Sequence, residues 1–288
     1  MRRFLPLVLI LTCAIFGFGE DHGRPAEPGS QGNGHDDHDD NGPVKAGFAI
    51  ITPAPVTTGG SLVVFATFGL KHGNEVGQAG LLPPGLTTNA MMSVNSSGRL
   101  SRNLAVAIVN PDSKNANVTL TLRDDEGKQL ATKTITVEGH HQMSQFLTEL
   151  FSSESSVPAD LTGTLAITST SPVGLAGLRF RGLNFSTLPI TNLSSVSSAV
   201  PVVSSGIGGT GAVLLPEFAA GGGWATEIVI VNTGTTSMTV RLDLFKQDGT
   251  ALTTTMNGQT GSSFTNLSIP ALGVLSLAPR DNKGDSDF

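Results

Sequence analysis

The chain has 288 residues, of which 39% are hydrophobic and only 14% are charged, and its formal net charge is −6. Most of the acidic excess lies in residues 20–43, so residues 44–288, with sixteen acidic and fourteen basic residues, are close to neutral. This balance argues against a nucleic-acid partner, because phosphate binding requires a basic field. The length allows about two domains with sizeable cores.

Residues 1–19 are predicted to be a signal peptide. They begin with Met1-Arg2-Arg3 and continue with an apolar run over 4–18, which is short for a membrane span and typical of a signal-peptide core. We therefore expect a secreted or extracytoplasmic protein with no transmembrane segment in the mature chain. Cys13, the only cysteine, offers an alternative as a lipoprotein acylation site, although residues 10–12 lack the small residue that cleavage prefers.

Residues 20–43 contain no aliphatic side chain larger than that of alanine, and they are predicted to form a disordered, acidic, Gly- and His-containing linker. Within it, His35, Asp36, His38 and Asp39 are candidate metal ligands, since imidazole and carboxylate groups suit Zn, Ni or Cu. A flexible peptide would bind a metal without set geometry, so a solvated tether is the preferred interpretation. No metal or other cofactor is predicted.

Residues 44–192 are predicted to form a first β-sandwich unit, because short apolar runs alternate there with turn residues at the spacing of a sandwich. A helix is expected at Met143–Phe151, where apolar residues recur at helical spacing. The expected strands are Gly47–Ile51, Ser61–Gly69, Ala90–Val94, Leu104–Val109, Asn117–Arg123, Gln129–Val137, Leu161–Thr168 and Val173–Arg181.

Residues 193–211 are rich in Ser and Gly and are predicted to be a linker, followed by a second, smaller unit at 212–280 and a polar tail at 281–288. The run Gly206–Gly211 matches the dinucleotide fingerprint G-x-G-x-x-G, but a short strand and a proline follow it instead of a helix, so a linker is preferred. The strands expected in the second unit are Ala212–Leu215, Ala225–Val231, Thr239–Phe245, Ala251–Met256, Ser263–Leu267 and Val274–Leu277. The predicted fold is all-β, with two Ig-like β-sandwich units in tandem.

The sequence also repeats itself at an offset of 122 residues, the separation of Asn110 from Asn232. The matching positions are apolar residues of alternating strands and a turn glycine, Gly127 or Gly249, which supplies the positive φ that a tight reversal needs. The two asparagines end a strand, where a side-chain amide can satisfy free backbone groups. The recurring residues therefore predict a duplicated structural unit and no repeated catalytic set.

Three runs carry a resemblance to a known kind of module: SGRLSRNLAVAIVNPDSKNANVTLTLRDDEG, GTLAITSTSPVGLAGLRFRGLNFSTLPIT and LLPEFAAGGGWATEIVIVNTGTTSMTVRLDLFKQDG. They are similar to modules found, often in tandem, in secreted proteins of environmental bacteria. The resemblance covers most of residues 47–280 and implies an exported β-sandwich. It implies no catalytic or binding residues, because that family is uncharacterised.

Other polar clusters have a structural interpretation. His140 and His141 are adjacent in an extended context, so their side chains should point to opposite faces and not share a metal, and a structural turn is the preferred interpretation. The run Asp124-Asp125-Glu126 lacks the spacing of a calcium loop and is predicted to be a solvated hairpin tip.

Three classes of function remain open. We expect an exported non-catalytic repeat protein with a structural, adhesion or display role, whose partner is an extracellular protein or polysaccharide. One alternative is a carbohydrate-binding module, for which Trp224, the only tryptophan, is the candidate ligand residue, although its place at the start of a strand predicts a core position. A second alternative is a glycan hydrolase with convergent carboxylates, drawn from Glu149, Glu154, Asp160, Glu217 and Glu227.

Overall fold

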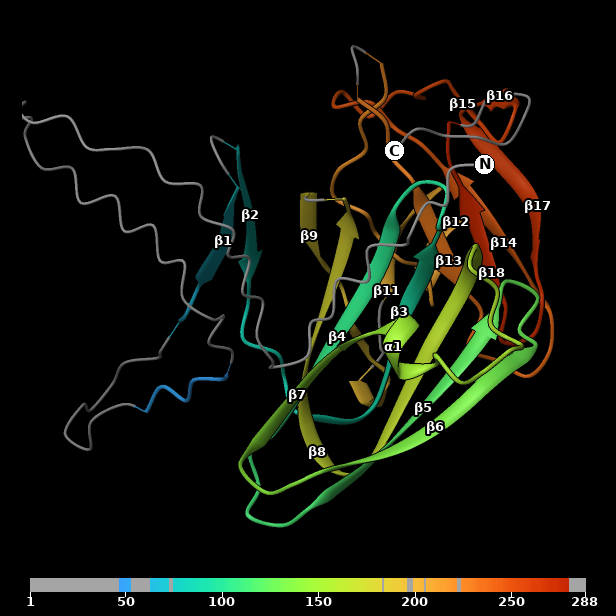
Figure 1. The fold of residues 1–288 in the computed structure, drawn as a ribbon. Helices are drawn as coiled ribbons and strands as arrows, with labels where there is room; N and C mark the ends of the chain where they lie inside the picture. The colour runs from blue at the N-terminus through green and yellow to red at the C-terminus, as the bar shows by residue number, and fades with distance from the viewer. Residues whose placement is uncertain are drawn as a thin grey trace, which may run out of the picture. The chain divides into compact units, whose positions relative to one another are not determined.

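The computed structural model describes residues 47–52, 63–72, 75–182, 184–195, 199–204, 206–221 and 224–279. The chain divides into two compact units, 1–59 and 60–288, and the second contains every assigned strand. The fold of the described residues is all-β, as predicted, and its strands pair in antiparallel fashion (Figure 1). The predicted signal peptide, the linker at 20–43 and the tail at 281–288 lie outside the described residues.

Residues 87–192, here called the first half, form two sheets that share one long strand. The elements from the start of the compact unit to the end of this half are β1 (Ala66–His72), β2 (Glu75–Leu81), β3 (Thr87–Ser96), β4 (Arg102–Asn110), β5 (Ala116–Asp124), β6 (Gln129–Val137), β7 (His141–Phe146), α1 (Leu147–Leu150), β8 (Leu161–Arg181), β9 (Asn184–Leu188) and β10 (Thr191–Asn192).

The shared strand is β8. Its first part pairs with β3 and β5, and its last part pairs with β4 and β9, so the strand leaves one sheet and enters the other near Pro172. The sequence predicts two strands here, separated by a break before Val173. The structure instead has one strand of 21 residues, because the backbone stays extended through the change of sheet, where Pro172 can be accommodated without a ladder N–H.

The core of the first half lies between these two sheets and follows the predicted alternation. Val118, Leu120 and Leu122 of β5 are buried, and the intervening residues point away from the core. The helix predicted at Met143–Phe151 is wrong over its first part. Met143 pairs with Ile108 of β4, so β7 extends to Phe146 and only the short helix α1 follows it.

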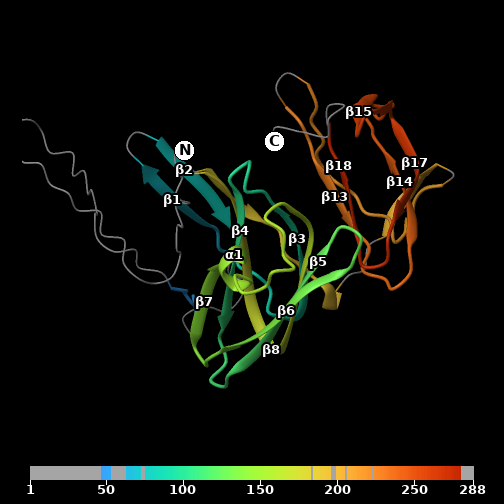
Figure 2. The ribbon, with the colours of Figure 1, turned by 45° about the vertical axis from the view of Figure 1, so that its right-hand side comes forward.

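Residues 225–279, the second half, form a smaller arrangement in which two strand pairs face each other across a second core (Figure 2). Ile228, Phe264 and Leu277 are buried in that core. The elements from the end of the first half onward are η1 (Leu193–Ser195), β11 (Ala199–Ser204), β12 (Ile207–Thr210), β13 (Ile228–Val231), β14 (Met238–Asp243), β15 (Thr254–Met256), β16 (Gln259–Gly261), β17 (Ser263–Ile269) and β18 (Val274–Leu277).

Three local predictions are corrected by the structure. Residues 199–210, expected to be part of a linker, form the β11–β12 hairpin. The strands expected at Gly47–Ile51 and Ala212–Leu215 do not form, and both segments are largely exposed. A strand requires a neighbour to pair with and a face to bury, and apolar composition alone supplies neither.

The two halves use the same pairing register. Val109 of β4 lies opposite Gln142 of β7, and Val231 of β13 lies opposite Val274 of β18. Val231 lies 122 residues after its equivalent Val109, whereas Val274 lies 132 residues after its equivalent Gln142. The β15–β16 hairpin accounts for the additional residues of the second half.

Candidate functional site

A buried asparagine holds the end of β4 in the first half. The side chain of Asn110 is fully buried, and its Nδ2 donates to the carbonyl oxygens of Lys114, Val137 and Glu138 at 2.7, 3.0 and 3.2 Å. Its Oδ1 accepts the N–H of Asp112 at 3.1 Å. One buried side chain thus bonds four backbone groups at the end of β4.

Asn232 makes the same four bonds in the second half. Its Nδ2 donates to the carbonyl oxygens of Thr236, Ile269 and Pro270 at 2.7, 3.3 and 2.9 Å, and its Oδ1 accepts the N–H of Gly234 at 2.9 Å. The predicted role of the two strand-ending asparagines is therefore confirmed. The asparagine that recurs in both halves therefore holds the backbone at the end of a strand in place.

A hairpin tip of the first half contacts a turn of the second half. The N–H of Val274 donates to the carbonyl oxygen of Asp125 at 2.8 Å. A Cβ atom on Gly127 would overlap the carbonyl oxygen of Ala271, and one on Gly273 would lie 2.6 Å from the carbonyl oxygen of Asp125. The prediction of a solvated tip holds for the exposed side chains of Asp125 and Glu126 but is wrong for the backbone, which is docked.

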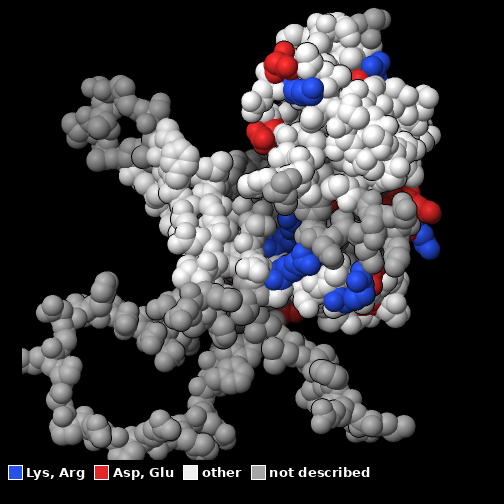
Figure 3. Space-filling view, turned by 90° about the horizontal axis from the view of Figure 1, so that it is seen from above, with Lys and Arg blue, Asp and Glu red and all other residues white. Residues whose placement is uncertain are grey.

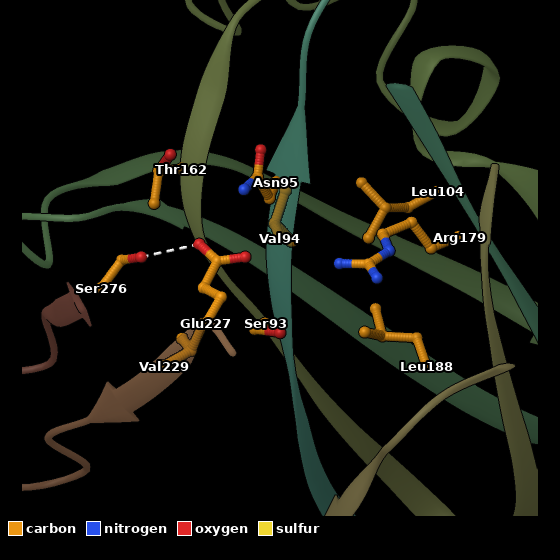
Figure 4. Close-up of a pocket in the computed structure, with 10 residues that line it drawn as sticks. All are labelled: Ser93, Val94, Asn95, Leu104, Thr162, Arg179, Leu188, Glu227, Val229 and Ser276. Carbon is orange, nitrogen blue, oxygen red and sulfur yellow. Dashed lines mark hydrogen bonds between the residues drawn. The ribbon is translucent and has the colours of Figure 1, made fainter. Parts of the chain in front are cut away.

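A hollow is lined by residues from both halves (Figure 4). Glu227 accepts a hydrogen bond from Ser276 Oγ at 2.7 Å on one side of β3, and Arg179 extends from β8 on the other side. The hollow encloses about 30 Å³, enough for no more than a few water molecules. The ten residues that line it are Ser93, Val94, Asn95, Leu104, Thr162, Arg179, Leu188, Glu227, Val229 and Ser276.

Three of the carboxylates proposed for a hydrolase site make separate structural bonds, and they are Glu149, Asp160 and Glu227. Glu149 accepts the N–H of Phe146 at the start of α1 at 3.0 Å, and Asp160 accepts the N–H of Gly98 at 2.9 Å. Of the five candidates, only Glu227 lines the hollow. No group of three or more His, Cys, Asp or Glu residues with the arrangement of a metal site occurs in the part of the chain that the structure describes.

The two histidines lie where a turn passes into a strand, since His140 is in the turn and His141 is the first residue of β7. His140 has a left-handed backbone with φ of 58°, and the Nδ1 of His141 lies 2.7 Å from the carbonyl oxygen of Gly139. Both side chains are exposed. The metal candidates His35, Asp36, His38 and Asp39, together with Cys13, lie outside the described residues.

Two aspartates have lowered pKa values. Hydrogen bonding from the hydroxyl and then the N–H of Thr250 lowers the pKa of Asp248 below its ordinary value of 3.8. The backbone N–H of Lys114 is the main cause of the lowered pKa of Asp112. Both groups are fully exposed and cap their own turns, so the lowered pKa values reflect local turn geometry.

Trp224 lies on the surface, which corrects the prediction of a core position. Its side chain is 74% exposed, and its backbone is bridged to that of Gly221. Strand β13 begins only at Ile228, so Trp224 precedes the strand. The segment before it carries further exposed apolar side chains. They are Val202, Val203, Val213, Leu214 and Leu215, here called the apolar set.

Residues Gly206–Gly211, which match the dinucleotide fingerprint, contribute to the β11–β12 hairpin. A Cβ on Gly208 would overlap the carbonyl oxygen of Pro201 on the paired strand, so the close approach of two strands requires glycine there. On the face shown in Figure 3, several Lys and Arg side chains lie close together near the middle, and most of the remaining described surface is uncharged. This agrees with the low charge of residues 44–288.

No protein-family model and no curated protein sequence matches this chain. A solved structure of an Anabaena sensory rhodopsin transducer is 18% identical to it, with a TM-score of 0.28, over 32% of this chain and 86% of the other. A solved structure of Thermotoga maritima 1070 is 15% identical, also with a TM-score of 0.28, over 36% of this chain and 90% of the other. Within the described residues, no helix has the length and apolarity needed to cross a membrane.

Proposed function

We propose that this chain is an exported, non-catalytic β-sandwich repeat protein with a structural, adhesion or display role at or outside the cell surface. The observation that carries the proposal is the matched pair Asn110 and Asn232, whose amides bind equivalent backbone groups in the two halves. The shared pairing register supports the same view. In this proposal the residues that recur in both halves hold the fold together, and exposed residues make the contact with a partner.

The apolar set supplies that contact surface in the proposal. Its side chains are between 52% and 77% exposed, so their apolar surface is available to a partner. The partner is an extracellular protein or polysaccharide. The resemblance to modules of secreted bacterial proteins supports the exported location in the proposal.

Retention of purified protein on whole cells tests the proposal. Leu214→Asp should lower the retained fraction several-fold, because it places a charge within the apolar set. Val76→Asp is the matched control, since Val76 is 59% exposed but lies on β2. If both variants and the parent protein are retained equally, the apolar set is not the contact surface. If the protein releases soluble sugars from the cells, the non-catalytic role is overturned.

Glycan binding is the second candidate, and the exposure of Trp224 favours it. An indole that is 74% exposed offers a flat apolar face on which a sugar ring can stack. Trp224→Ala should abolish retention on cell-wall or extracellular polysaccharide. Phe245→Ala, at a site that is 43% exposed, is the control, and a loss of retention in both variants would contradict a specific stacking role for Trp224.

A further inference from the structure

The described residues of the second half include no counterpart of β8, the strand that completes the first half. In the first half, β8 pairs with β5 on one side and with β3 on the other. In the second half, β14 pairs with β17, and the described part of the chain has no strand on the other side of β14. At the offset of 122 residues, Val213–Leu215 correspond to Met91–Ser93 of β3, and they form no strand.

Residues that β8 covers in the first half are more exposed at the equivalent positions after it. Leu120 of β5 is fully buried, whereas its equivalent Leu242 in β14 is half-buried. Met92 of β3 is 1% exposed, whereas its equivalent Leu214 is 70% exposed. Since burial of these apolar side chains is favourable, β14 and residues 213–215 are suited to accept one more strand between them.

Residues 47–56 repeat the sequence of β8 at an offset of 117 residues. Phe48-Ala49-Ile50 corresponds to Leu165-Ala166-Ile167 of β8. Pro55-Val56 is identical to Pro172-Val173 at the same offset. The chain therefore contains a second segment with the sequence pattern of the strand that the second half lacks.

The part of this segment that the structure describes, residues 47–52, is here called the donor segment. It forms no strand, and its side chains are exposed. Phe48 is 39% exposed and Ile50 is 66% exposed, whereas their equivalents Leu165 and Ile167 in β8 are almost completely buried. The donor segment thus has the apolar side chains of a core strand without the core.

We infer that the donor segment of one molecule docks as a strand between β14 and residues 213–215 of a second copy of the chain. The register of β8 on β5 places Ile50 opposite Leu242. The register of β8 on β3 places Ala49 opposite Val213. The added strand bonds both neighbours through its backbone and buries alternate side chains, as in other cases of strand addition.

The docked strand is expected to begin after Ala46. A Cβ atom on Gly163 of β8 would overlap the carbonyl oxygen of Arg123, and Ala46 stands at the position of Gly163. The pairing register places Phe48 opposite Leu244, one residue beyond the end of β14. Since β14 ends there, the donor chain can leave the sheet before Ala46.

A second copy is the partner because the hairpin that follows the donor segment is fixed on its own first half. The β1–β2 hairpin lies beside β9, and Phe68 stacks on Phe185 with ring centroids 5.3 Å apart (Figure 1). Strand β9 belongs to the sheet of β4 and β7, whereas the contact with Val274 is made at the tip of the β5–β6 hairpin in the other sheet. Reciprocal exchange of the donor segment gives a closed dimer, and one-way docking gives longer assemblies.

Sedimentation velocity of the purified full chain tests this inference. The weight-average mass should rise above that of a monomer as the protein concentration increases from about 1 μM to about 1 mM. A mass that stays that of a monomer over this range would overturn the inference.

Ile50→Asp should weaken association by about tenfold or more, because it places a charge at a position that is buried in the docked strand. Ile51→Asp is the matched control, since Ile51 is 57% exposed and its equivalent Thr168 lies on the outer face of β8. The control should associate like the parent chain. If the two variants associate equally, the donor segment does not dock in this register and the inference fails.

Leu214→Asp tests the accepting surface and should weaken association as much as Ile50→Asp does. Val202→Asp is its control, because Val202 and Leu214 are both 70% exposed but Val202 lies on β11, away from the proposed strand. Equal association of Leu214→Asp and Val202→Asp would contradict docking beside residues 213–215.

A disulfide distinguishes docking between molecules from docking within one. The variant Ala49→Cys/Val213→Cys, with Cys13→Ser to remove the natural thiol, places two cysteines opposite each other in the proposed ladder. Their Cα atoms would be about 5 Å apart, which a disulfide can span. Oxidation should yield covalent dimers or larger species on a non-reducing gel. Monomers closed by an internal disulfide, or no disulfide at all, would overturn the inference.

The inference rests on the contact role of the apolar set in the proposed function and names a second copy as the partner of Leu214. Ile50→Asp leaves the apolar set unchanged, so at concentrations where the chain is monomeric it should be retained on cells like the parent protein. Self-association is measured on purified protein and retention is measured on cells. Failure of the inference and failure of the proposed function are therefore distinguishable.

Discussion

Replacing Asn110 by alanine removes four hydrogen bonds from the interior of the first half. The two N–H groups of the amide are shared among three carbonyl oxygens, so with the accepted bond the side chain makes about three full hydrogen bonds. At about 1 kcal/mol net for each, the free energy of unfolding should fall by about 3 kcal/mol. The loss is large because the side chain is fully buried and its bond to the Val137 carbonyl lies in the interior. Asn232→Ala removes the equivalent four bonds and should cost a similar amount.

Guanidinium chloride unfolding followed by circular dichroism measures this loss. Asn117→Ala is the control, since the Asn117 side chain is exposed and accepts one bond from the Thr136 hydroxyl at 2.9 Å. The control should change the free energy of unfolding by no more than about 0.5 kcal/mol. If Asn110→Ala also changes it by less than about 1 kcal/mol, the amide does not hold the turn and the reasoning fails.

Asn110→Asp separates lost bonding from lost volume, because the two side chains have nearly the same shape. The new carboxylate would face three carbonyl oxygens and donate no bond, so its pKa in the folded protein should rise above the unfolded value. A raised folded pKa means that the folded state binds more protons, and stability is lost as the pH rises through that pKa. The variant should therefore be relatively more stable in acid, and a parallel pH profile for variant and parent would contradict this.

Three further predictions follow from burial, local bonding and the N-terminal sequence. Leu120→Ala should lower the free energy of unfolding by about 2 to 5 kcal/mol, and Leu242→Ala, at a half-buried site, by about 1 to 2 kcal/mol; urea unfolding would contradict this if the order were reversed. Because the pKa of Asp248 is lowered in the folded protein, its carboxylate contributes stability above the ordinary pKa of 3.8, and this stability is lost as the pH falls through the lower folded pKa. Asp248→Asn should therefore lose less stability than the parent protein between pH 7 and about pH 2. Equal losses in the two proteins would refute this. Export should remove residues 1–19, and N-terminal analysis of secreted protein that still begins at Met1 would exclude this.

The sequence alone determined the all-β class, the alternating faces and the role of the repeated asparagines. Val118, Leu120 and Leu122 are apolar at every second position, and this spacing is sufficient to predict which face of β5 is buried. An asparagine at the end of a strand is likewise a local signal, because in both halves its amide bonds the carbonyl of the residue four positions later. The alternation and the bond to the fourth residue depend on residues that are close in sequence, whereas the other two carbonyl groups that Asn110 bonds belong to Val137 and Glu138.

Only the tertiary structure decided which elements join and which surfaces remain exposed. The continuity of β8 past Pro172, the strand β7 in place of most of a predicted helix, and the contact of the hairpin tip at 124–128 with the turn at 270–274 all depend on partners far away in sequence. The exposure of Trp224 has the same origin, because its position depends on where β13 starts to pair with β18. Burial of an apolar side chain is favourable wherever it occurs in the sequence, but the neighbouring elements in the fold determine which apolar side chains are buried.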